Sequence, residues 1–273
     1  MLKTSNNLIG VFDSGLGGLS VLKNFLSDVP GYHYIYLGDT ARVPYGNKSP
    51  ETIYNYTIEA VEFLFKQNCH LVIIACNTAS AQALRQLQRE WLPKYYPDRK
   101  VLGVIKPLAE AATCYNFKRI GIIGTTATIN SKTYTTEIHE LNSNLKVYDQ
   151  AAPLLVPLIE EGRINNPETK LILKSYLAPL QAKKIDGLIL ACTHYPHLQD
   201  LIQKIMGKSV TIPDTGKIIA ASLKNYLSRH AELKITKDKT NCNFYTTDNP
   251  KMFKDLAEKF LNQKIKNVSQ IDL

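Results

Sequence analysis

Short apolar segments alternate with longer amphipathic segments along this 273-residue chain. Leu8–Phe12, Tyr34–Leu37 and Leu71–Ala75 have the length and character of buried strands, and Glu51–Gln67 has apolar side chains on one helical face. The alternation starts again after residues 93–100, a polar stretch with two prolines. Strands that alternate with helices predict an α/β protein with mainly parallel sheets. The other expected strands are Val101–Ile105, Arg119–Ile123, Leu145–Tyr148, Gly187–Ala191 and Asn243–Thr247, and the other expected helices are Leu19–Leu26, one through Leu84, Leu87 and Trp91, Pro167–Ala182, Lys217–Arg229 and Lys251–Leu261.

A weak internal repeat points to two related halves. Val72–Thr78 resembles Ile189–Thr193, because in both an apolar run ends in Ala-Cys and a small polar residue follows. Ile9–Ser14 similarly resembles Ile120–Thr125. Each second copy lies roughly 110 residues after the first, so the sequence predicts two pseudo-symmetric halves of that length.

The composition excludes several classes of protein. Apolar residues make up 44% and charged residues 21% of the chain, which excludes wholesale disorder. Its 14 glycines and 13 prolines are too few for a fibrous protein. No apolar run approaches the roughly 18–20 residues that span a bilayer, so no membrane association is expected. Residues 1–7 are polar and do not resemble a signal peptide, so we expect a cytoplasmic protein.

The five cysteines and the net charge of +9 exclude few further classes of protein. An odd number of cysteines without a secretion signal argues against a disulfide framework, and the absence of any C-x-x-C pair gives no support to a closed zinc site. More than half of the basic excess lies in residues 217–273. Neither an arginine-rich cluster nor an RNA-binding motif accompanies it, so no nucleic-acid partner is expected.

Four motifs follow the predicted strands directly. Asp13–Gly18 follows the first strand, Gly38–Gly46 the second and Cys76–Thr78 the third, while Cys192–Pro196 follows the matching strand of the second half. Ligands bind outside the carboxyl ends of the strands in open α/β sheets. These four segments are therefore the candidate site.

The glycines of the first motif allow two interpretations. Gly15, Gly17 and Ser20 nearly complete a dinucleotide-binding fingerprint, and Asp39 ends the next strand, so a nucleotide-dependent oxidoreductase is one alternative. Asp13 argues against it, because an acid in front of the glycines would face the pyrophosphate. A tight turn with close helix packing explains the glycines without any ligand.

Cys76 and Cys192 each stand where a helix is expected to begin. A helix N-terminus favours an anion, and such a position brings the pKa of a thiol from about 8.5 towards neutrality. If the two halves face each other, two thiols approach one ligand from opposite sides, which is the geometry of a two-base racemisation. A metal-binding or redox module that uses both thiols and His194 is the non-enzymatic alternative.

The chain resembles the bacterial glutamate racemases of the aspartate/glutamate racemase family. The likeness covers roughly residues 8–215, and the His-Tyr-Pro sequence after Cys192 favours glutamate over aspartate racemases. Thr215 stands where the family would have serine, and Ala191 stands where glycine is common. The segments that carry the resemblance are Val11–Gly18, Gly38–Gly46, Ala75–Ala79, Gly103–Pro107, Ile123–Thr128, Val156–Glu160 and Cys192–Pro196.

The resemblance implies a role for each matching residue. Cys76 and Cys192 would be the two catalytic acid/bases, with Cys76 expected to deprotonate D-glutamate. Asp13 would assist Cys76 and raise its pKa, His194 would assist Cys192, and Glu160 would be a further catalytic neighbour. The implied substrate-binding residues are Asp13, Ser14, Tyr45, Gly46, Asn77, Thr78, Thr193 and His194.

Simpler roles stay open for several of these residues. Asp13 is alternatively a cap on the glycine turn, His194 a structural histidine and Tyr45 a packed aromatic of its loop. Asn77, Thr78 and Thr193 are alternatively helix caps. Arg42 is expected to brace its loop, and Cys69, Cys114 and Cys242 are expected to serve in packing.

The resemblance also implies an architecture and a cellular role. Residues 1–96 and 211–273 would form one α/β domain and residues 97–210 a second, with the active site in the cleft between them. The enzyme would be a cofactor-independent isomerase without a metal, acting as a cytoplasmic homodimer that supplies D-glutamate for peptidoglycan, and hence for cell wall biogenesis and cell shape. Aspartate or another acidic amino acid is the alternative substrate.

Overall fold

The computed structural model describes residues 8–233, 235, 239–266 and 268–273, so residues 1–7 lie outside the described part. The strands are β1 Leu8–Asp13, β2 His33–Gly38, β3 Cys69–Ile74, β4 Lys100–Gly103, β5 Arg119–Gly124, β6 Lys146–Ala151, β7 Gly187–Ala191, β8 Asn241–Thr246 and β9 Val268–Gln270. The α-helices are α1 Leu19–Asp28, α2 Pro50–Lys66, α3 Asn77–Gln82, α4 Leu84–Gln86, α5 Leu92–Tyr95, α6 Ile105–Cys114, α7 Thr126–Asn130, α8 Thr133–Leu141, α9 Leu155–Glu160, α10 Pro167–Ala182, α11 Gln199–Met206, α12 Thr215–Arg229 and α13 Pro250–Leu261.

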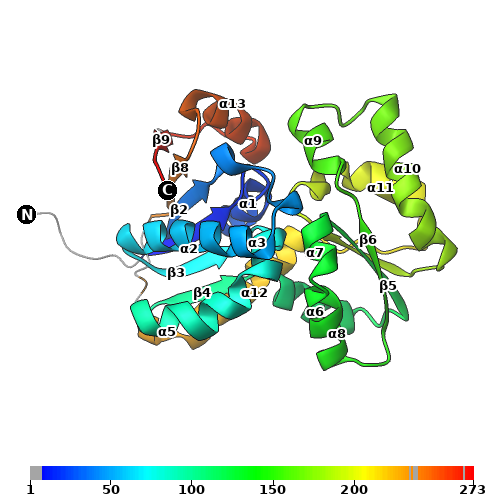
Figure 1. Ribbon diagram of the computed structural model, residues 1–273, viewed down its shortest axis with the longest axis horizontal. Coiled ribbons are helices and arrows are strands. Elements are labelled where there is room, and N and C mark those ends of the chain that lie inside the picture. The colour runs from blue at the N-terminus through cyan, green and yellow to red at the C-terminus, as the bar shows by residue number, and fades with distance from the viewer. Residues whose placement is uncertain (1–7, 234, 236–238, 267) are drawn as a thin grey trace, which may run out of the picture.

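The strands form two separate parallel sheets, as the alternation of strands and helices predicted. The first has the order β4-β3-β1-β2-β8-β9 and the second the order β6-β5-β7. The two sheets lie in two lobes, and the C-terminal strands β8 and β9 return to the first lobe (Figure 1). Within the second sheet, β5 pairs in parallel with both of its neighbours.

The internal repeat corresponds to equivalent positions in the two sheets. In each, a central strand lies between the two strands that follow it: β3-β1-β2 in the first sheet and β7-β5-β6 in the second. The repeated segments coincide with β1 and β5 and with β3 and β7. Cys76 and Cys192 therefore stand at corresponding places, just beyond β3 and β7.

Local sequence signals explain where most elements begin. Ser49 caps α2, because its side chain accepts a hydrogen bond from the Thr52 amide, and Pro50 occupies the first turn. The apolar face of α2 then packs against the first sheet, whose central strands are buried on both faces. Helix boundaries predicted from such signals agree with the structure within one or two residues in α2, α10 and α13.

The single helix expected through Leu84, Leu87 and Trp91 is wrong. The chain instead forms α3, α4, a π-helical turn at Leu87–Trp91 and α5. Ala83 departs from helical geometry with a φ of −115°, and the proline at position 93 lacks the amide that would continue a regular helix. The short strand β9 was not expected either.

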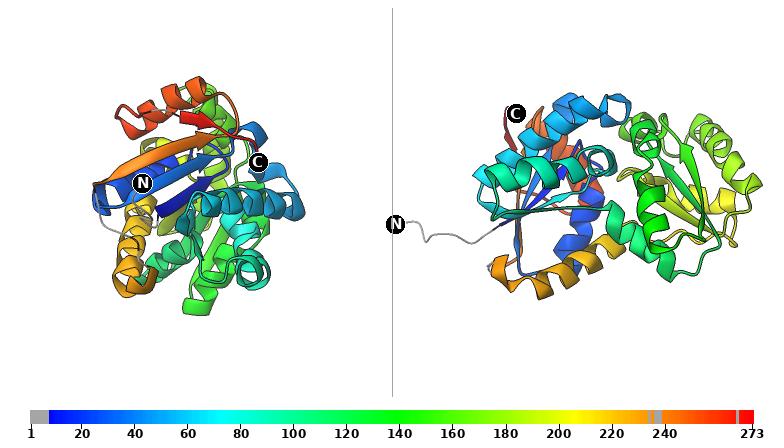
Figure 2. Two further views of the ribbon diagram at one scale, coloured as in Figure 1. Left: turned by 90° about the vertical axis from the view of Figure 1, so that its left-hand side faces the viewer. Right: turned by 60° about the horizontal axis from the view of Figure 1, so that its bottom comes forward.

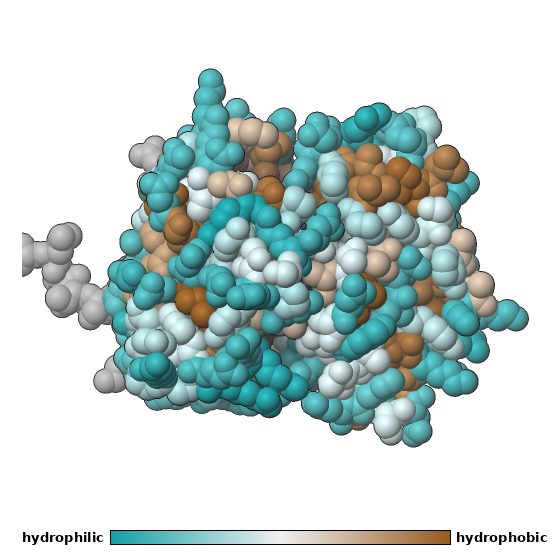
Figure 3. Space-filling view, in the orientation of Figure 1, coloured by the Kyte–Doolittle hydropathy of each residue, from teal (hydrophilic) through white to brown (hydrophobic). Residues whose placement is uncertain are grey.

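Helices α6 and α12 lie at the junction of the two lobes. They pack against each other, while α12 also packs on α1 and α6 on α8 (Figure 2). On the face shown in Figure 3, hydrophilic residues cover most of the first lobe, and apolar residues gather over α9 and α10. Leu171 of α10 and Leu154, which directly precedes α9, are exposed. No helix in the described part of the chain combines the length and the apolar character needed to cross a bilayer.

Candidate active site

Asp13 joins the two halves of the molecule at the end of β1. It is fully buried, and its carboxylate accepts one hydrogen bond from the Gly15 amide at 2.9 Å and another from the Thr193 hydroxyl at 3.2 Å. Burial raises the pKa of Asp13, and the neighbouring His194 and these hydrogen bonds oppose that shift. Asp13 thus both orders the glycine turn and contacts the second half.

Cys76 lies beside this carboxylate and caps α3. Its sulfur accepts a hydrogen bond from the Ala79 amide at 3.5 Å and lies 3.3 Å from Ser14 Oγ. Burial, followed by the negative charge of Asp13, raises the pKa of Cys76 to about 12. The expected rise caused by Asp13 is confirmed, whereas the helix start does not bring this pKa towards neutrality, because α3 has only 6 residues and burial outweighs its dipole. Cys76 is therefore a protonated thiol at neutral pH.

Cys192 lies in a different electrostatic environment. Its sulfur lies 3.9 Å from His194 Nδ1, and His194 Nε2 lies 3.0 Å from Glu160 Oε1. Burial acts to lower the pKa of His194, but the hydrogen bonds to Cys192 and Glu160 outweigh it and raise that pKa to about 10. The imidazole is therefore a cation at neutral pH with an N–H directed to each partner.

The prediction that a helix begins directly at Cys192 is wrong. A 3-10 helix, Tyr195–Leu198, intervenes, and α11 begins at Gln199. Cys192 is consequently not a helix cap, and the positive charge that faces it comes from His194 rather than from a helix dipole.

The glycine turn of the first half packs directly against the Cys192 segment. A Cβ atom on Gly17 would lie 2.3 Å from Thr193 Oγ1 and 2.5 Å from His194 Nδ1, which no real side chain tolerates. The Ser20 hydroxyl also donates to the Thr193 carbonyl at 3.0 Å. Close packing therefore explains Gly17 without a ligand, and Thr193 bonds to Asp13 rather than capping a helix.

Asp39 holds the loop that carries Tyr45. It is fully buried and accepts hydrogen bonds from Arg42 Nε, from the Tyr45 hydroxyl and, at 2.8 Å, from Thr247 Oγ1. Arg42 also pairs with Glu59, so its predicted bracing role is confirmed. Because Asp39 already accepts hydrogen bonds from three protein groups, it is not available to bind a ribose. This observation removes the main support for a nucleotide-dependent oxidoreductase. The hydroxyl of Tyr45 is used in this network.

A cluster of buried threonines brings the two halves together near Cys76. The Thr78 hydroxyl lies 2.9 Å from that of Thr125 and 3.3 Å from that of Thr128. A Cβ on Gly46 would lie 2.8 Å from Thr125 Cβ, so the Tyr45–Gly46 loop packs against the same cluster. Thr125 and Thr128 were not among the predicted site residues. The repeat contained the signal for Thr125, which follows β5 as Ser14 follows β1.

Asn77, the residue after Cys76, has a partner that the sequence did not predict. Its side-chain oxygen accepts a hydrogen bond of 2.5 Å from the hydroxyl of Tyr134, which lies on α8 in the second half. Both side chains are buried. Tyr134 lies inside an ordinary amphipathic helix, so no local pattern distinguished it.

Comparison with known proteins identifies the family. The profile of the Asp/Glu/hydantoin racemase family matches residues 9–223. The chain belongs to this family. A glutamate racemase of Chlorobaculum parvum is 42% identical over 266 residues, which cover 97% of this chain and 96% of the relative.

Solved structures of the racemase family have the same fold. A glutamate racemase of Bacillus anthracis matches with a TM-score of 0.91 and 36% identity over 99% of both chains. A glutamate racemase of Francisella tularensis, solved in complex with D-glutamate, matches with a TM-score of 0.87 and 37% identity over 98% of both chains.

The other three cysteines of this family member lie outside the candidate site. Cys69 is fully buried in β3 and Cys242 is half-buried in β8, as a packing role requires. Cys114 is exposed at the end of α6, so the packing prediction is wrong for this residue. In the described part of the chain, no group of three or more His, Cys, Asp or Glu residues is arranged to hold a metal ion.

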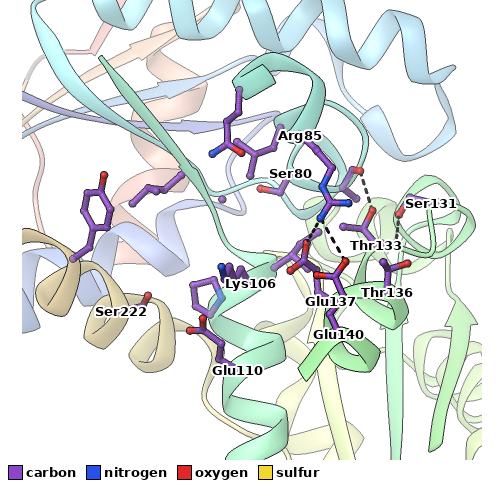
Figure 4. Close-up of a pocket in the computed structure, with 18 of the residues that line it drawn as sticks. Ser80, Arg85, Lys106, Glu110, Ser131, Thr133, Thr136, Glu137, Glu140 and Ser222 are labelled. Atoms are coloured by element: carbon purple, nitrogen blue, oxygen red, sulfur yellow. Dashed lines mark hydrogen bonds and ion pairs between the residues drawn. The ribbon is translucent and has the colours of Figure 1, made fainter. Parts of the chain in front are cut away.

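A separate cavity of about 780 Å³ lies where the two lobes of the racemase fold meet. Its walls come from α3, α4, α6, α8 and α12, and they include none of the predicted site residues. Figure 4 shows Arg85 on one wall with Glu137 and Glu140 opposite it, at 3.2 and 3.9 Å. This cavity therefore differs from the place where the two thiols lie.

Proposed function

We propose that the protein is a glutamate racemase, an isomerase that interconverts L- and D-glutamate without a cofactor. The observation that carries the proposal is the pair of thiols at equivalent strand ends of the two halves, connected through Asp13 and Thr193. Relatives named glutamate racemase, at 39–42% identity over nearly the whole chain, support glutamate as the substrate.

The placement of the two thiols at equivalent strand ends suits a two-base proton transfer at Cα. In the L-to-D direction, the Cys192 thiolate removes the α-proton of L-glutamate, and the Cys76 thiol donates a proton to the opposite face. Cys192 ends protonated and Cys76 ends as a thiolate, so D-glutamate is converted by the reverse transfer. The His194 cation stabilises the Cys192 thiolate, and Ser14 with the Ala79 amide stabilises the thiolate on Cys76.

Proton transfer by positioned groups contributes only ~10²–10⁴-fold to a rate. The remaining acceleration must come from groups that stabilise the carboxylate while the α-carbon carries negative charge. Asn77, Thr78 and the Tyr45–Gly46 loop on the Cys76 side, and Thr193 on the Cys192 side, are the proposed donors. Asp13, Ser14 and His194 complete the proposed binding residues.

We propose the predicted domain division with a refinement at each boundary. The return of β8 and β9 to the first sheet supports the assignment of the C-terminal segment to the first domain, while the pairing of Thr211 with Gly187 and the packing of Ile212 in the second-lobe core support a second boundary after Ile212 rather than at residue 211. Strand β4 pairs with β3, which moves the first boundary from residue 97 to about residue 104. Cys76 and Cys192 are only 4% and 6% exposed, so entry of glutamate into the proposed cleft requires the two domains to move apart.

The proposed cellular role is to supply D-glutamate for peptidoglycan in the cytoplasm, with no membrane or nucleic-acid partner. We also propose a homodimer. The exposed apolar surface over α9 and α10 supports self-association, because apolar patches on soluble proteins mark interaction sites. Sedimentation of the wild type and of a Leu171→Glu variant tests this proposal.

One experiment tests the proposed reaction. Purified protein incubated with L-glutamate in D₂O, with no added cofactor, is expected to give D-glutamate that carries deuterium at Cα. Parallel incubations with L-aspartate distinguish the alternative substrate. Racemisation of aspartate but not glutamate would replace the substrate assignment, and racemisation of neither would refute the function.

A further inference from the structure

Tyr134 reaches from the second half into the Cys76 side of the site. Its ring is 2% exposed, and its hydroxyl lies 2.5 Å from Asn77 Oδ1. Asn77 follows Cys76 directly and begins α3. The hydrogen bond therefore joins α8 to the residue next to one of the two thiols.

The tyrosine hydroxyl is the donor in this pair. Burial, followed by the nearby Cys192, raises the pKa of Tyr134 well above its ordinary value, so the hydroxyl keeps its proton at every working pH. In the described part of the chain, Asn77 Oδ1 is the acceptor that this hydroxyl reaches. If the amide were rotated, its NH₂ group would donate to the tyrosine oxygen, and the buried hydroxyl proton would lose its acceptor.

The opposite end of the Asn77 amide is free to bind a ligand. Among the described residues, Asn77 Nδ2 has no hydrogen-bond partner. This nitrogen is not fully buried, so it keeps some contact with solvent. Asn77 itself is 5% exposed. A nearly buried amide nitrogen that keeps access to solvent beside Cys76 is a donor available to an anion.

We propose that Tyr134 is a positioning residue that fixes the orientation of the Asn77 amide, so that its N–H groups face a carboxylate of the substrate. The inference rests on the proposed function, because it assigns Asn77 a carboxylate of glutamate. Tyr134 does not itself contact the reacting atoms. It determines whether Asn77 presents donors or an acceptor oxygen to the ligand.

The Tyr134→Phe variant removes the hydroxyl and keeps the ring. KM for glutamate is expected to rise roughly tenfold in both directions, the size of one lost charge-assisted hydrogen bond, while kcat changes less than about threefold. Tyr34→Phe is the matched control, because Tyr34 is equally buried and donates to the Val29 carbonyl at 2.7 Å, away from the site. An unchanged KM in Tyr134→Phe, or an equal rise in the control, would overturn the proposal.

Two variants of Asn77 separate positioning from general destabilisation. If Tyr134 acts through Asn77, the double variant Tyr134→Phe/Asn77→Ala has the same KM as Asn77→Ala, whereas independent effects multiply. Asn77→Asp keeps the oxygen that Tyr134 contacts and places a second oxygen where the donors were, so its KM is expected to exceed that of Asn77→Ala. A KM near that of the wild type in Asn77→Asp would reverse the proposed orientation. Failure of the wild type to racemise glutamate would instead refute the proposed function.

Discussion

The two thiols occupy equivalent places in the two halves, but their neighbours have opposite charges. Cys76 lies beside the carboxylate of Asp13 and the hydroxyl of Ser14, and its pKa is raised to about 12. Cys192 lies beside the His194 cation, which Glu160 holds from the other side. The repeated strand end determines where each sulfur lies, and the neighbouring side chains determine the charge that faces it.

This difference suits a reaction that needs one acid and one base at the same time. Two thiols in identical surroundings would have the same intrinsic pKa. The carboxylate of Asp13 favours the protonated form of Cys76, whereas the His194 imidazolium places a positive charge beside Cys192. The two sides of the site therefore differ in charge before the substrate binds.

The largest predicted effect follows from removing either sulfur. Cys76→Ser and Cys192→Ser are each expected to slow racemisation roughly 10²–10⁴-fold, because the hydroxyl is a much weaker acid than the thiol and does not ionise to a base at neutral pH. Rates measured by circular dichroism in both directions check this. Cys114→Ser, which changes an exposed cysteine outside the site, is the control and should retain the full rate. A fully active variant at either Cys76 or Cys192 would refute the two-thiol mechanism.

The second prediction concerns the charge on the Cys192 side. The pKa of His194 lies at about 10 in the folded protein, above its ordinary value of 6.5, so the stability that its charge contributes is complete below about pH 6.5 and is lost as the pH rises through about 10. His194→Asn is expected to lower the racemisation rate roughly 10–100-fold and to remove this alkaline loss of stability. Urea unfolding of the wild type and the variant at several pH values tests whether the free energy of unfolding falls as the pH rises. If the free energy of unfolding depends on pH in the same way in both proteins, His194 is neutral in the folded state.

The sequence predicted where the residues of this comparison lie better than it predicted their charges and pKa values. The strand ends, the repeat and the cysteines were visible because strand periodicity and adjacent residues are local properties. The pKa of Cys76 was predicted only in part, because the rise caused by Asp13 was expected but the larger effect of burial depends on the whole fold. The hydrogen bond between Tyr134 and Asn77 was equally hidden, since it joins two side chains of different halves.

The third prediction tests how closely the two sides must approach. Gly17→Ala places a Cβ against Thr193 and His194 at distances below 3.0 Å, so the Cys192 segment must shift. We expect a loss of about 1–3 kcal/mol in the free energy of unfolding and a drop of roughly tenfold in kcat/KM. Gly15→Ala in the same turn is the milder comparison, because its nearest neighbour, Val43 Cγ1, lies at 3.0 Å. Thermal melts and kinetics that rank Gly15→Ala as the more damaging variant would contradict the packing argument.

The smallest predicted effect lies at the cavity between the lobes, away from both thiols. Arg85 of α4 pairs with Glu137 of α8 at 3.2 Å, but the arginine side chain is 57% exposed (Figure 4). Exposed ion pairs contribute about 0–1 kcal/mol, so Arg85→Ala should lower the free energy of unfolding by less than that and leave racemisation within about twofold. Urea unfolding and steady-state kinetics check both values. The buried contacts of Asp13, Gly17 and the threonine cluster then hold the halves together, whereas a large loss in Arg85→Ala would assign that role to the cavity side.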